Sequence, residues 1–278
     1  MYRILKGKEV ADSMLEETRV IVEQMERKPH LAIVLVGNDP ASEVYVKKKL
    51  EKAEAIGVRT TLKKMDEDTS EEDILKIVEK LNEDSDVDGF IVQAPLPKQI
   101  DFTKIVEMIK PEKDVDGWTS ANMGRMFVGL PALMPATPLG VMKMLEYYEI
   151  ELNGKNVTVI GRSNVVGKPL ALMLLKKNAT VTVCHSRTKN LSVHTKNADV
   201  VVAAVGKPGL VTANMIKEGA YVIDVGTTRV DGKIKGDVLF EEVIKKANCS
   251  PVPGGAGPMT VAVLISNVVM AAQMTAGK

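Results

Sequence analysis

Hydrophobic positions in the first half of the chain switch repeatedly between helical and strand spacing. From Gly7 to Arg27 they recur at helical intervals until Pro29, and Leu31 to Val36 is a short apolar run suited to a buried strand. Because strands and helices continue to alternate, the pattern predicts a parallel sheet. The expected elements are helices over 7–27, 40–52 and 70–81, the last capped by Ser70, and strands over 31–36, 58–65 and 89–92.

The second half repeats this alternation more regularly and predicts a doubly wound nucleotide-binding domain. Residues 118–137 show no regular pattern, and Thr137-Pro138 then begins a helix that runs to Tyr148. We therefore place a domain boundary near Thr137. The expected strands cover 156–160, 180–184, 200–205 and 221–225, with a helix over 168–177 between the first two.

The last helix decides how the chain divides. Its residues are apolar nearly all round from Val261 to Met274, and Thr260 is placed to cap it. Such a helix is expected to be buried, most simply by packing back on the first domain. The sequence thus predicts an α/β protein of two domains. The N-terminal α/β domain comprises residues 1–137 plus 259–278, and the Rossmann-like, doubly wound domain comprises residues 138–258.

Composition excludes several classes of function. The 37 basic and 36 acidic side chains nearly cancel and aromatic residues make up 4%, so no nucleic-acid partner is expected. Residues 1–10 lack the apolar core of a secretory signal, and the apolar stretch Thr260–Met274 is interrupted by Ser266 and Asn267 and too short to span a bilayer. We expect a cytoplasmic protein without membrane contact. The spacing of its 2 cysteines and 3 histidines predicts neither disulfide nor metal site.

Tyr45 and Lys49 stand four residues apart in the expected helix over 40–52, so they share a face. A phenol ring and a desolvated, uncharged amine in one cleft are suited to stacking on a flat heterocycle and moving a proton on it. However, Lys47 and Lys48 form a run with Lys49, and such runs usually make a solvated helix face. From spacing alone, both interpretations stay open.

Two further polar side chains follow predicted elements. Gln93 begins a stiff segment at the carboxyl end of the strand over 89–92, where open sheets bind ligands, but its amide would serve equally to satisfy loop backbone. In the turn over 111–117, Asp114 is interpreted as a cap of a surface turn. Asp116, between an apolar residue and a glycine, is suited to accept paired donors from a ligand, although spacing does not separate this role from capping.

A glycine turn follows the first strand of the second domain and leads into a helix whose amino end suits a phosphate. The turn departs from the usual G-x-G-x-x-G pattern, since Gly161 and Gly167 are its only glycines. The next strand ends at His185-Ser186-Arg187, without the acidic residue that binds the ribose hydroxyl of NAD. A hydroxyl and a guanidinium there, with Arg162, suit a ribose phosphate, which predicts NADP rather than NAD. The alternative is that both arginines are solvated loop charges.

Residues 250–260 precede the last helix and combine three prolines with three glycines. Glycines allow a ligand to approach the backbone closely. A plain connecting loop is the alternative on composition alone.

Six motifs occur together, in one order, along nearly the whole chain. On them the sequence resembles the bifunctional methylenetetrahydrofolate dehydrogenase and methenyltetrahydrofolate cyclohydrolase family. Two positions depart from the family pattern, Ala94 where leucine is common and Ala256 where valine is usual; both are smaller apolar residues that remove no chemical group. The motifs are Tyr45–Lys49, Val92–Pro97, Pro111–Gly117, Gly161-Arg162-Ser163 with Val166-Gly167, Cys184-His185-Ser186, and Pro251–Thr260.

The resemblance implies a role for each candidate residue. Lys49 would be the catalytic lysine, Tyr45 would stack on the folate, Gln93 would hydrogen-bond to the lysine and tune it, and Asp116 would bind the pterin. Gly257 and Pro258 would line the folate and nicotinamide cleft. The residues expected at the cofactor are Gly161, Arg162, Ser163, Gly167, Ser186 and Arg187.

The expected activity is oxidation of methylenetetrahydrofolate by NADP, followed by hydrolysis of the methenyl product to formyltetrahydrofolate. The first domain would bind folate and carry the catalytic residues, and the resemblance implies a homodimer. Two other functions are weighed. A dehydrogenase without the hydrolytic step is disfavoured because Lys49 and Gln93 are both present, and a non-catalytic NADP-binding regulatory protein need not retain Tyr45, Lys49 and Asp116 together.

Overall fold

The computed structural model describes residues 2–276. They form two compact units, one of residues 2–12 with Thr137–Thr260 and one of Ser13–Ala136 with residues 261–276. The division falls inside the first helix and inside the last, so each of these helices contributes to both units. Each unit contains a parallel sheet with helices, which confirms the predicted α/β class.

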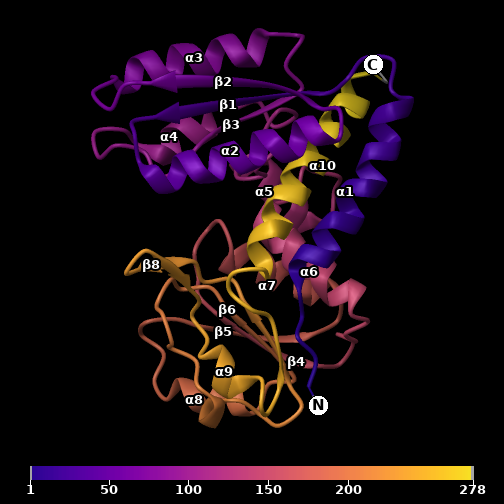
Figure 1. Ribbon diagram of the computed structural model, residues 1–278, viewed down its shortest axis with the longest axis vertical. Coiled ribbons are helices and arrows are strands. Elements are labelled where there is room, and N and C mark those ends of the chain that lie inside the picture. The colour runs from indigo at the N-terminus through magenta and orange to yellow at the C-terminus, as the bar shows by residue number, and fades with distance from the viewer. Residues whose placement is uncertain (1, 277–278) are drawn as a thin grey trace. The chain divides into compact units, whose positions relative to one another are not determined.

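The unit built on Ser13–Ala136, called here the first unit, contains a parallel sheet in the order β2-β1-β3 (Figure 1). Because β1 is central, the chain turns to opposite sides of it after β1 and after β2, which makes the carboxyl ends of β1 and β3 a switch point. Its elements are part of α1 (Gly7–Gln24), β1 (His30–Val36), α2 (Pro40–Ala55), β2 (Arg59–Met65), α3 (Glu71–Glu83), β3 (Gly89–Val92), α4 (Phe102–Glu107), α5 (Ser120–Val128) and most of α10 (Ala256–Ala276).

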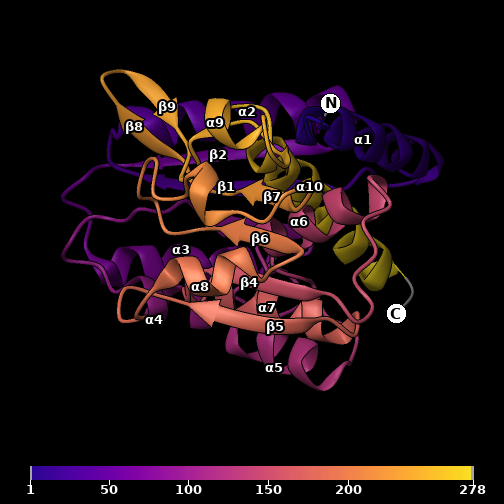
Figure 2. The ribbon, with the colours of Figure 1, turned by 90° about the horizontal axis from the view of Figure 1, so that it is seen from below.

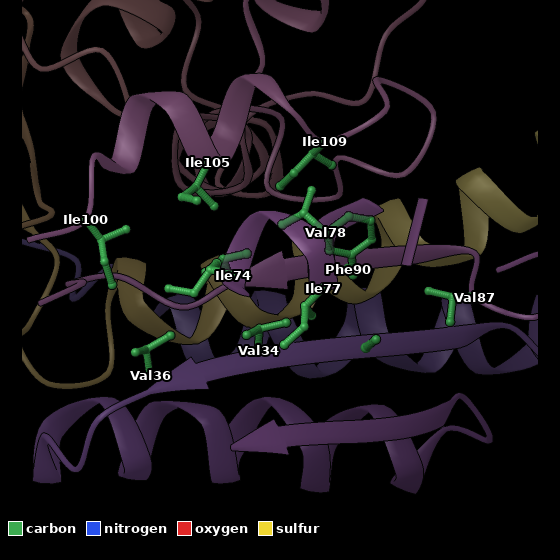
Figure 3. Close-up of a cluster of buried hydrophobic side chains, with 12 residues drawn as sticks. Val34, Val36, Ile74, Ile77, Val78, Val87, Phe90, Ile100, Ile105 and Ile109 are labelled. Atoms are coloured by element: carbon green, nitrogen blue, oxygen red, sulfur yellow. The ribbon is translucent and has the colours of Figure 1, made fainter. Parts of the chain in front are cut away.

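One face of this sheet carries a continuous hydrophobic core. Alternate residues of β1 and β3 pack with the apolar faces of α3 and α4. Figure 3 shows Ile77 beside Val34, with Phe90 and Val78 close together in the same cluster. Ser70 caps α3 by accepting the Asp73 N–H at 3.1 Å, as predicted, so the helix begins where its apolar face meets the sheet.

The other unit, called the second unit, contains five parallel strands in the order β10-β7-β6-β4-β5. Figure 2 shows β5, β4, β6 and β7 following one another across it. Because β5 lies on one side of β4 and β6 on the other, the order reverses at β4, as a doubly wound sheet requires. Its elements are α6 (Ala136–Tyr147), β4 (Asn156–Ile160), α7 (Gly167–Lys176), β5 (Thr180–Cys184), α8 (Leu191–Lys196), β6 (Val200–Ala203), η1 (Ala213–Met215), β7 (Tyr221–Asp224), β8 (Thr228–Val230), β9 (Lys233–Lys235), α9 (Phe240–Val243) and β10 (Asn248–Cys249).

Most predicted strands and long helices lie within a few residues of their observed limits, but short elements are missing from the prediction. The segment 118–137, expected to be irregular, contains α5, which Thr119 caps by accepting the Asn122 N–H at 3.3 Å. The elements absent from the prediction are α4, α5, α8, η1, the β8–β9 hairpin, α9 and β10.

The last helix begins earlier than predicted. It starts at Ala256, so Thr260 is not its cap; its hydroxyl lies 3.5 Å from the Ala256 carbonyl within the helix. Pro258 falls in the first turn, where its missing N–H removes no helical hydrogen bond. Gly257 and Pro258 therefore belong to a helix and not to the expected loop.

Contrary to the prediction that this stretch is too short to span a bilayer, α10 is long and apolar enough to cross one by length and composition. Its burial accounts for that composition: over half of the apolar stretch is covered by protein. Asn267, one of its two polar interruptions, donates through Nδ2 to the carbonyls of Val115 at 2.8 Å and Met134 at 2.9 Å. These contacts confirm that residues 261–276 pack on the first unit.

Candidate active site

Lys49 is buried, although the two lysines before it are exposed. It lies on the face of α2 that also buries Ser42, Val46 and Ala53, whereas Lys47 and Lys48 point into solvent. Asp39 fixes the start of the helix, since its carboxylate accepts the Ser42 N–H at 2.8 Å. The lysine run is therefore a solvated face at two of its three positions, and the third places an amine inside the protein.

Gln93 holds the Lys49 amine. It follows β3, and its backbone N–H donates to the Val34 carbonyl at 2.9 Å, which extends the pairing with β1 by one residue. The side-chain Nε2 donates to the Ala94 carbonyl at 2.6 Å, so Oε1 faces the lysine and accepts from its Nζ at 3.0 Å. Ala94 thus orients the amide through its backbone, which its side chain does not affect.

The two aspartates of the turn after α4 have different roles. The Asp114 carboxylate accepts the N–H groups of Gly117 at 2.9 Å, Trp118 at 3.1 Å and Thr119 at 2.7 Å, and the Asn122 amide at 3.0 Å. This is the capping role that the sequence predicted, in a buried setting rather than on the surface. Asp114 also pairs with Phe90 in a parallel bridge, which aligns this segment beside β3.

Asp116 is buried and lies electrostatically close to Lys49. Burial raises the pKa of its carboxyl to about 6, against the opposing effect of the Lys49 charge. Burial likewise lowers the pKa of the Lys49 amine, and the Asp116 charge opposes that shift. A buried amine whose pKa is lowered and a buried carboxyl whose pKa is raised are suited to donate and accept protons.

Tyr45 lies at the edge of this site. It precedes Lys49 by one helical turn, but Tyr45 is 37% exposed whereas Lys49 is only 8% exposed. A partly exposed ring beside a buried amine is suited to stacking on a flat ligand that covers it. The structure therefore brings Lys49, Gln93 and Asp116 together in the first unit and leaves Tyr45 open to solvent.

The glycine turn after β4 has the packing of a dinucleotide site. Gly161 has φ +125°, and a Cβ there would lie 2.3 Å from the Ala204 carbonyl oxygen. A Cβ on Gly167 would lie 2.2 Å from the Gly161 carbonyl oxygen, so these two glycines allow the helix to pack closely on the strand. Ser163 stands between them, and its hydroxyl accepts the Val166 N–H at 3.1 Å and organises the turn.

The residues expected at a ribose phosphate are exposed on adjacent loops. β4 and β5 pair in register from Asn156 with Thr180 to Ile160 with Cys184, so the turns that follow them lie at the same edge of the sheet. Arg162, Ser163, Ser186 and Arg187 are all exposed there. The sequence prediction omitted Thr188, whose hydroxyl accepts the His185 N–H at 2.9 Å and shapes the second turn.

Gly257 and Pro258 open α10 in the second unit, apart from the lysine group of the first unit along the chain. A Cβ on Gly257 would meet no atom within 4 Å, so this position leaves open space beside the backbone. Among residues 2–276 no group of three or more histidine, cysteine or acidic side chains is arranged to hold a metal ion. Both cysteines are buried and free.

A doubly wound domain with a phosphate-type turn, joined to an α/β unit that buries an amine beside an amide, defines a two-domain nucleotide-dependent enzyme. Family models agree. Residues 5–116 match the tetrahydrofolate dehydrogenase/cyclohydrolase catalytic domain, and residues 135–276 match the NAD(P)-binding domain of the same family. The chain belongs to the tetrahydrofolate dehydrogenase/cyclohydrolase family.

Individual relatives match along their whole length. The bifunctional protein FolD of Staphylococcus haemolyticus is 48% identical over 280 residues, which cover 99% of this chain and 98% of that protein. The crystal structure of the bifunctional FolD enzyme from Campylobacter jejuni superposes with a TM-score of 0.96 at 43% identity, covering 99% of each chain. The FolD structure from Trypanosoma brucei, in complex with NADP and an inhibitor, gives a TM-score of 0.96 at 35% identity over 100% of this chain and 99% of that one.

These findings confirm the predicted fold class, activity and cofactor. The chain is a soluble bifunctional methylenetetrahydrofolate dehydrogenase and methenyltetrahydrofolate cyclohydrolase that uses NADP and acts on folate derivatives. The individual roles of the site residues stay predictions.

Proposed function

We propose that this chain oxidises methylenetetrahydrofolate with NADP and then hydrolyses the methenyl product, with Lys49 as the acid and base of the hydrolytic step. The observation that carries this assignment is the buried Lys49 amine held 3.0 Å from the Gln93 amide oxygen. Structural lysines seldom occupy such a place, because burial disfavours their charge. A lysine that acts as a base needs such a buried position, because burial favours the neutral amine that can accept a proton.

The residues of the second unit suit NADP. The close packing at Gly161 and Gly167 leaves the backbone of the turn accessible to a pyrophosphate, and the exposed Arg162, Ser186 and Arg187 offer donors to a ribose phosphate. When bound, NADP supplies a hydride acceptor. The chain would contribute position, because holding the two reactants at reacting distance lowers the barrier without a charged catalytic group.

Hydrolysis needs proton transfer as well as position. Neutral Lys49 takes a proton from the water that adds to the methenyl carbon, and the resulting ammonium returns a proton to the ring nitrogen. The bond between this nitrogen and the former methenyl carbon then breaks, and the added hydroxyl releases its remaining proton to solvent as it becomes the formyl C=O. The Gln93 oxygen accepts from the amine in both states and keeps Nζ directed at one point. Asp116 accepts paired N–H donors of the pterin, and Tyr45 stacks on the folate.

The remaining proposals concern organisation. Residues 1–137 plus 259–278 are proposed as the folate-binding catalytic domain, and residues 138–258 as the NADP-binding domain. We further propose a cytoplasmic homodimer that binds neither nucleic acid nor membrane. The near balance of 37 basic and 36 acidic residues supports the absence of a nucleic-acid partner.

A spectroscopic assay tests the proposal. Purified protein mixed with methylenetetrahydrofolate and NADP should show NADPH absorbance that rises with turnover, and methenyltetrahydrofolate added alone should lose its absorbance as it is hydrolysed. NADPH production without enzymatic loss of methenyl absorbance would leave a dehydrogenase that lacks the hydrolytic step. Absence of both signals in a folded protein would contradict the proposed function altogether.

A further inference from the structure

The loop after β6, residues 205–207, borders the dinucleotide turn. β6 lies next to β4, and the strand order reverses between them, which is where a doubly wound sheet binds its ligand. The two loops touch: a Cβ on Gly161 would lie 2.3 Å from the Ala204 carbonyl oxygen and 3.5 Å from a Val205 methyl carbon. The candidates for binding the ribose phosphate lie on the loops after β4 and β5. We therefore expect the loop after β6, on the other side of the switch point, to contact the nicotinamide half of the cofactor.

A buried carboxylate holds this loop from the inside. Asp237 is fully buried, and one of its oxygens accepts the N–H groups of Val205 at 2.7 Å and Gly206 at 3.1 Å, while the other accepts the Lys207 N–H at 2.6 Å. Three consecutive backbone amides thus converge on one anion. Gly206 has φ +67°, the left-handed conformation that this convergence uses.

Asp237 is itself fixed by a second buried carboxylate. Asp224, at the end of β7, accepts the N–H groups of Asp237 at 3.0 Å and Val238 at 2.9 Å. Glycines leave room for both acids, since a Cβ on Gly226 would lie 2.4 Å from an Asp237 oxygen and one on Gly236 would lie 2.0 Å from an Asp224 oxygen. The position of the loop is therefore set by β7 through two carboxylates in series.

We infer that Asp237 is a positioning residue for hydride transfer: its carboxylate fixes residues 205–207 in the shape that receives the nicotinamide half of NADP. The inference rests on the proposed use of NADP by this chain. It is specific to one of the two activities, because hydrolysis of the methenyl compound uses no hydride acceptor. The candidate catalytic group for the hydrolysis, Lys49, lies in the first unit, whereas Asp237 lies in the second unit.

The test is Asp237→Asn, which keeps the shape and replaces one acceptor oxygen by an NH₂ group that opposes a backbone N–H. We expect the KM for NADP to rise about tenfold or more, since hydrogen bonds to a charged group are each worth about one factor of ten. Hydrolysis of methenyltetrahydrofolate should stay within about twofold of the wild-type rate, because its catalytic group is untouched.

The matched control is Asp199→Asn. Asp199 lies in the same unit and also accepts a backbone amide, that of Asn156 at 3.0 Å, but it precedes β6 and so lies at the opposite edge of the sheet. Its replacement should leave the KM for NADP unchanged. A rise in this KM in Asp199→Asn equal to that in Asp237→Asn would mean a general structural effect and would overturn the inference.

The outcomes separate the inference from the function on which it rests. A folded Asp237→Asn protein with wild-type KM and rate for NADP, or one that loses both activities in proportion, would overturn the positioning role while the wild-type activities still stand. Failure of the wild type to reduce NADP would instead contradict the function. If Asp237→Asn does not fold, the KM of a Gly206→Ala variant for NADP is measured instead. An alanine at this left-handed position strains the same loop, so the KM should rise. An unchanged KM for NADP would overturn the inference.

Discussion

Replacement of Asp116 by asparagine should make the protein more stable at neutral pH and less active. The folded carboxyl has a pKa of about 6 against an ordinary value of 3.8, because burial disfavours its charge. Between these values the folded chain retains a proton that the unfolded chain has lost, so the free energy of unfolding falls as pH rises. At about 1.4 kcal/mol for each pKa unit, the loss amounts to about 3 kcal/mol by pH 7.

The Asp116→Asn variant has no charge to bury, so it should escape this loss. Urea unfolding at a series of pH values would measure it, followed by the fluorescence of Trp118, the only tryptophan in the sequence, which lies in the same unit. We expect the free energies of unfolding of variant and wild type to be similar near pH 3.5 and to diverge by up to about 3 kcal/mol at pH 7. The kcat/KM for folate substrates should fall about tenfold or more, because an amide cannot accept two N–H donors as a carboxylate does.

Asp114→Asn provides the matched control, since the two aspartates are two residues apart and both are buried. Asp114 accepts hydrogen bonds from four donors, so its replacement should lower the free energy of unfolding at pH 7 by about 1–3 kcal/mol. Two results would refute the assignment of Asp116 as a functional carboxyl whose buried charge lowers stability. One is an Asp116→Asn protein that is less stable than wild type at pH 7, and the other is a difference in stability that does not change with pH.

Two further substitutions test the two halves of the reaction. Lys49→Met should reduce methenyltetrahydrofolate hydrolysis by about 10²–10⁴-fold, the usual contribution of a general acid and base, with hydride transfer less affected; hydrolysis at the wild-type rate would exclude the lysine from this step. Arg187→Ala should reduce the ratio of kcat/KM for NADP to that for NAD by about 10–100-fold, whereas Lys176→Ala, in the last turn of α7, should not change it. An unchanged NADP preference in Arg187→Ala would remove this arginine from the phosphate site.

Most of the parallel strands were predictable because apolar and β-branched residues dominate them, either as a buried run, as in 89–92, or in alternation with threonine, as in 180–184. The strands at 89–92, 156–160 and 180–184 were predicted to the residue. Short elements such as α5 and the β8–β9 hairpin carry too few apolar positions to show a period, and α5 depends on a Thr119 cap that has no glutamate partner three residues later. The start of α10 was misplaced because glycine and proline at 257 and 258 suggest a loop, although proline is tolerated in a first helical turn.

The site shows the same contrast between local and tertiary information. Spacing placed Tyr45 and Lys49 on one face but did not reveal that Lys49 alone of three lysines is buried, because that depends on packing of α2 against the sheet. The different roles of Asp114 and Asp116 likewise became apparent only in the folded turn, where the Asp114 carboxylate is occupied by hydrogen bonds from backbone N–H groups. Asp237 gave no local signal, since its partners lie about 30 residues earlier in the chain.

The pKa of Lys49 itself decides whether this amine can act as the base of the hydrolysis. NMR of protein labelled with ¹⁵N at lysine Nζ, with the Lys49 signal assigned by its absence in Lys49→Met, would follow the amine through a pH titration. The expected pKa lies below the ordinary value of 10.5, because burial disfavours the ammonium more than Asp116 favours it. In Asp116→Asn the pKa should fall further. A Lys49 pKa at or above 10.5 in the wild type would contradict the proposal that a neutral, buried amine carries the hydrolysis.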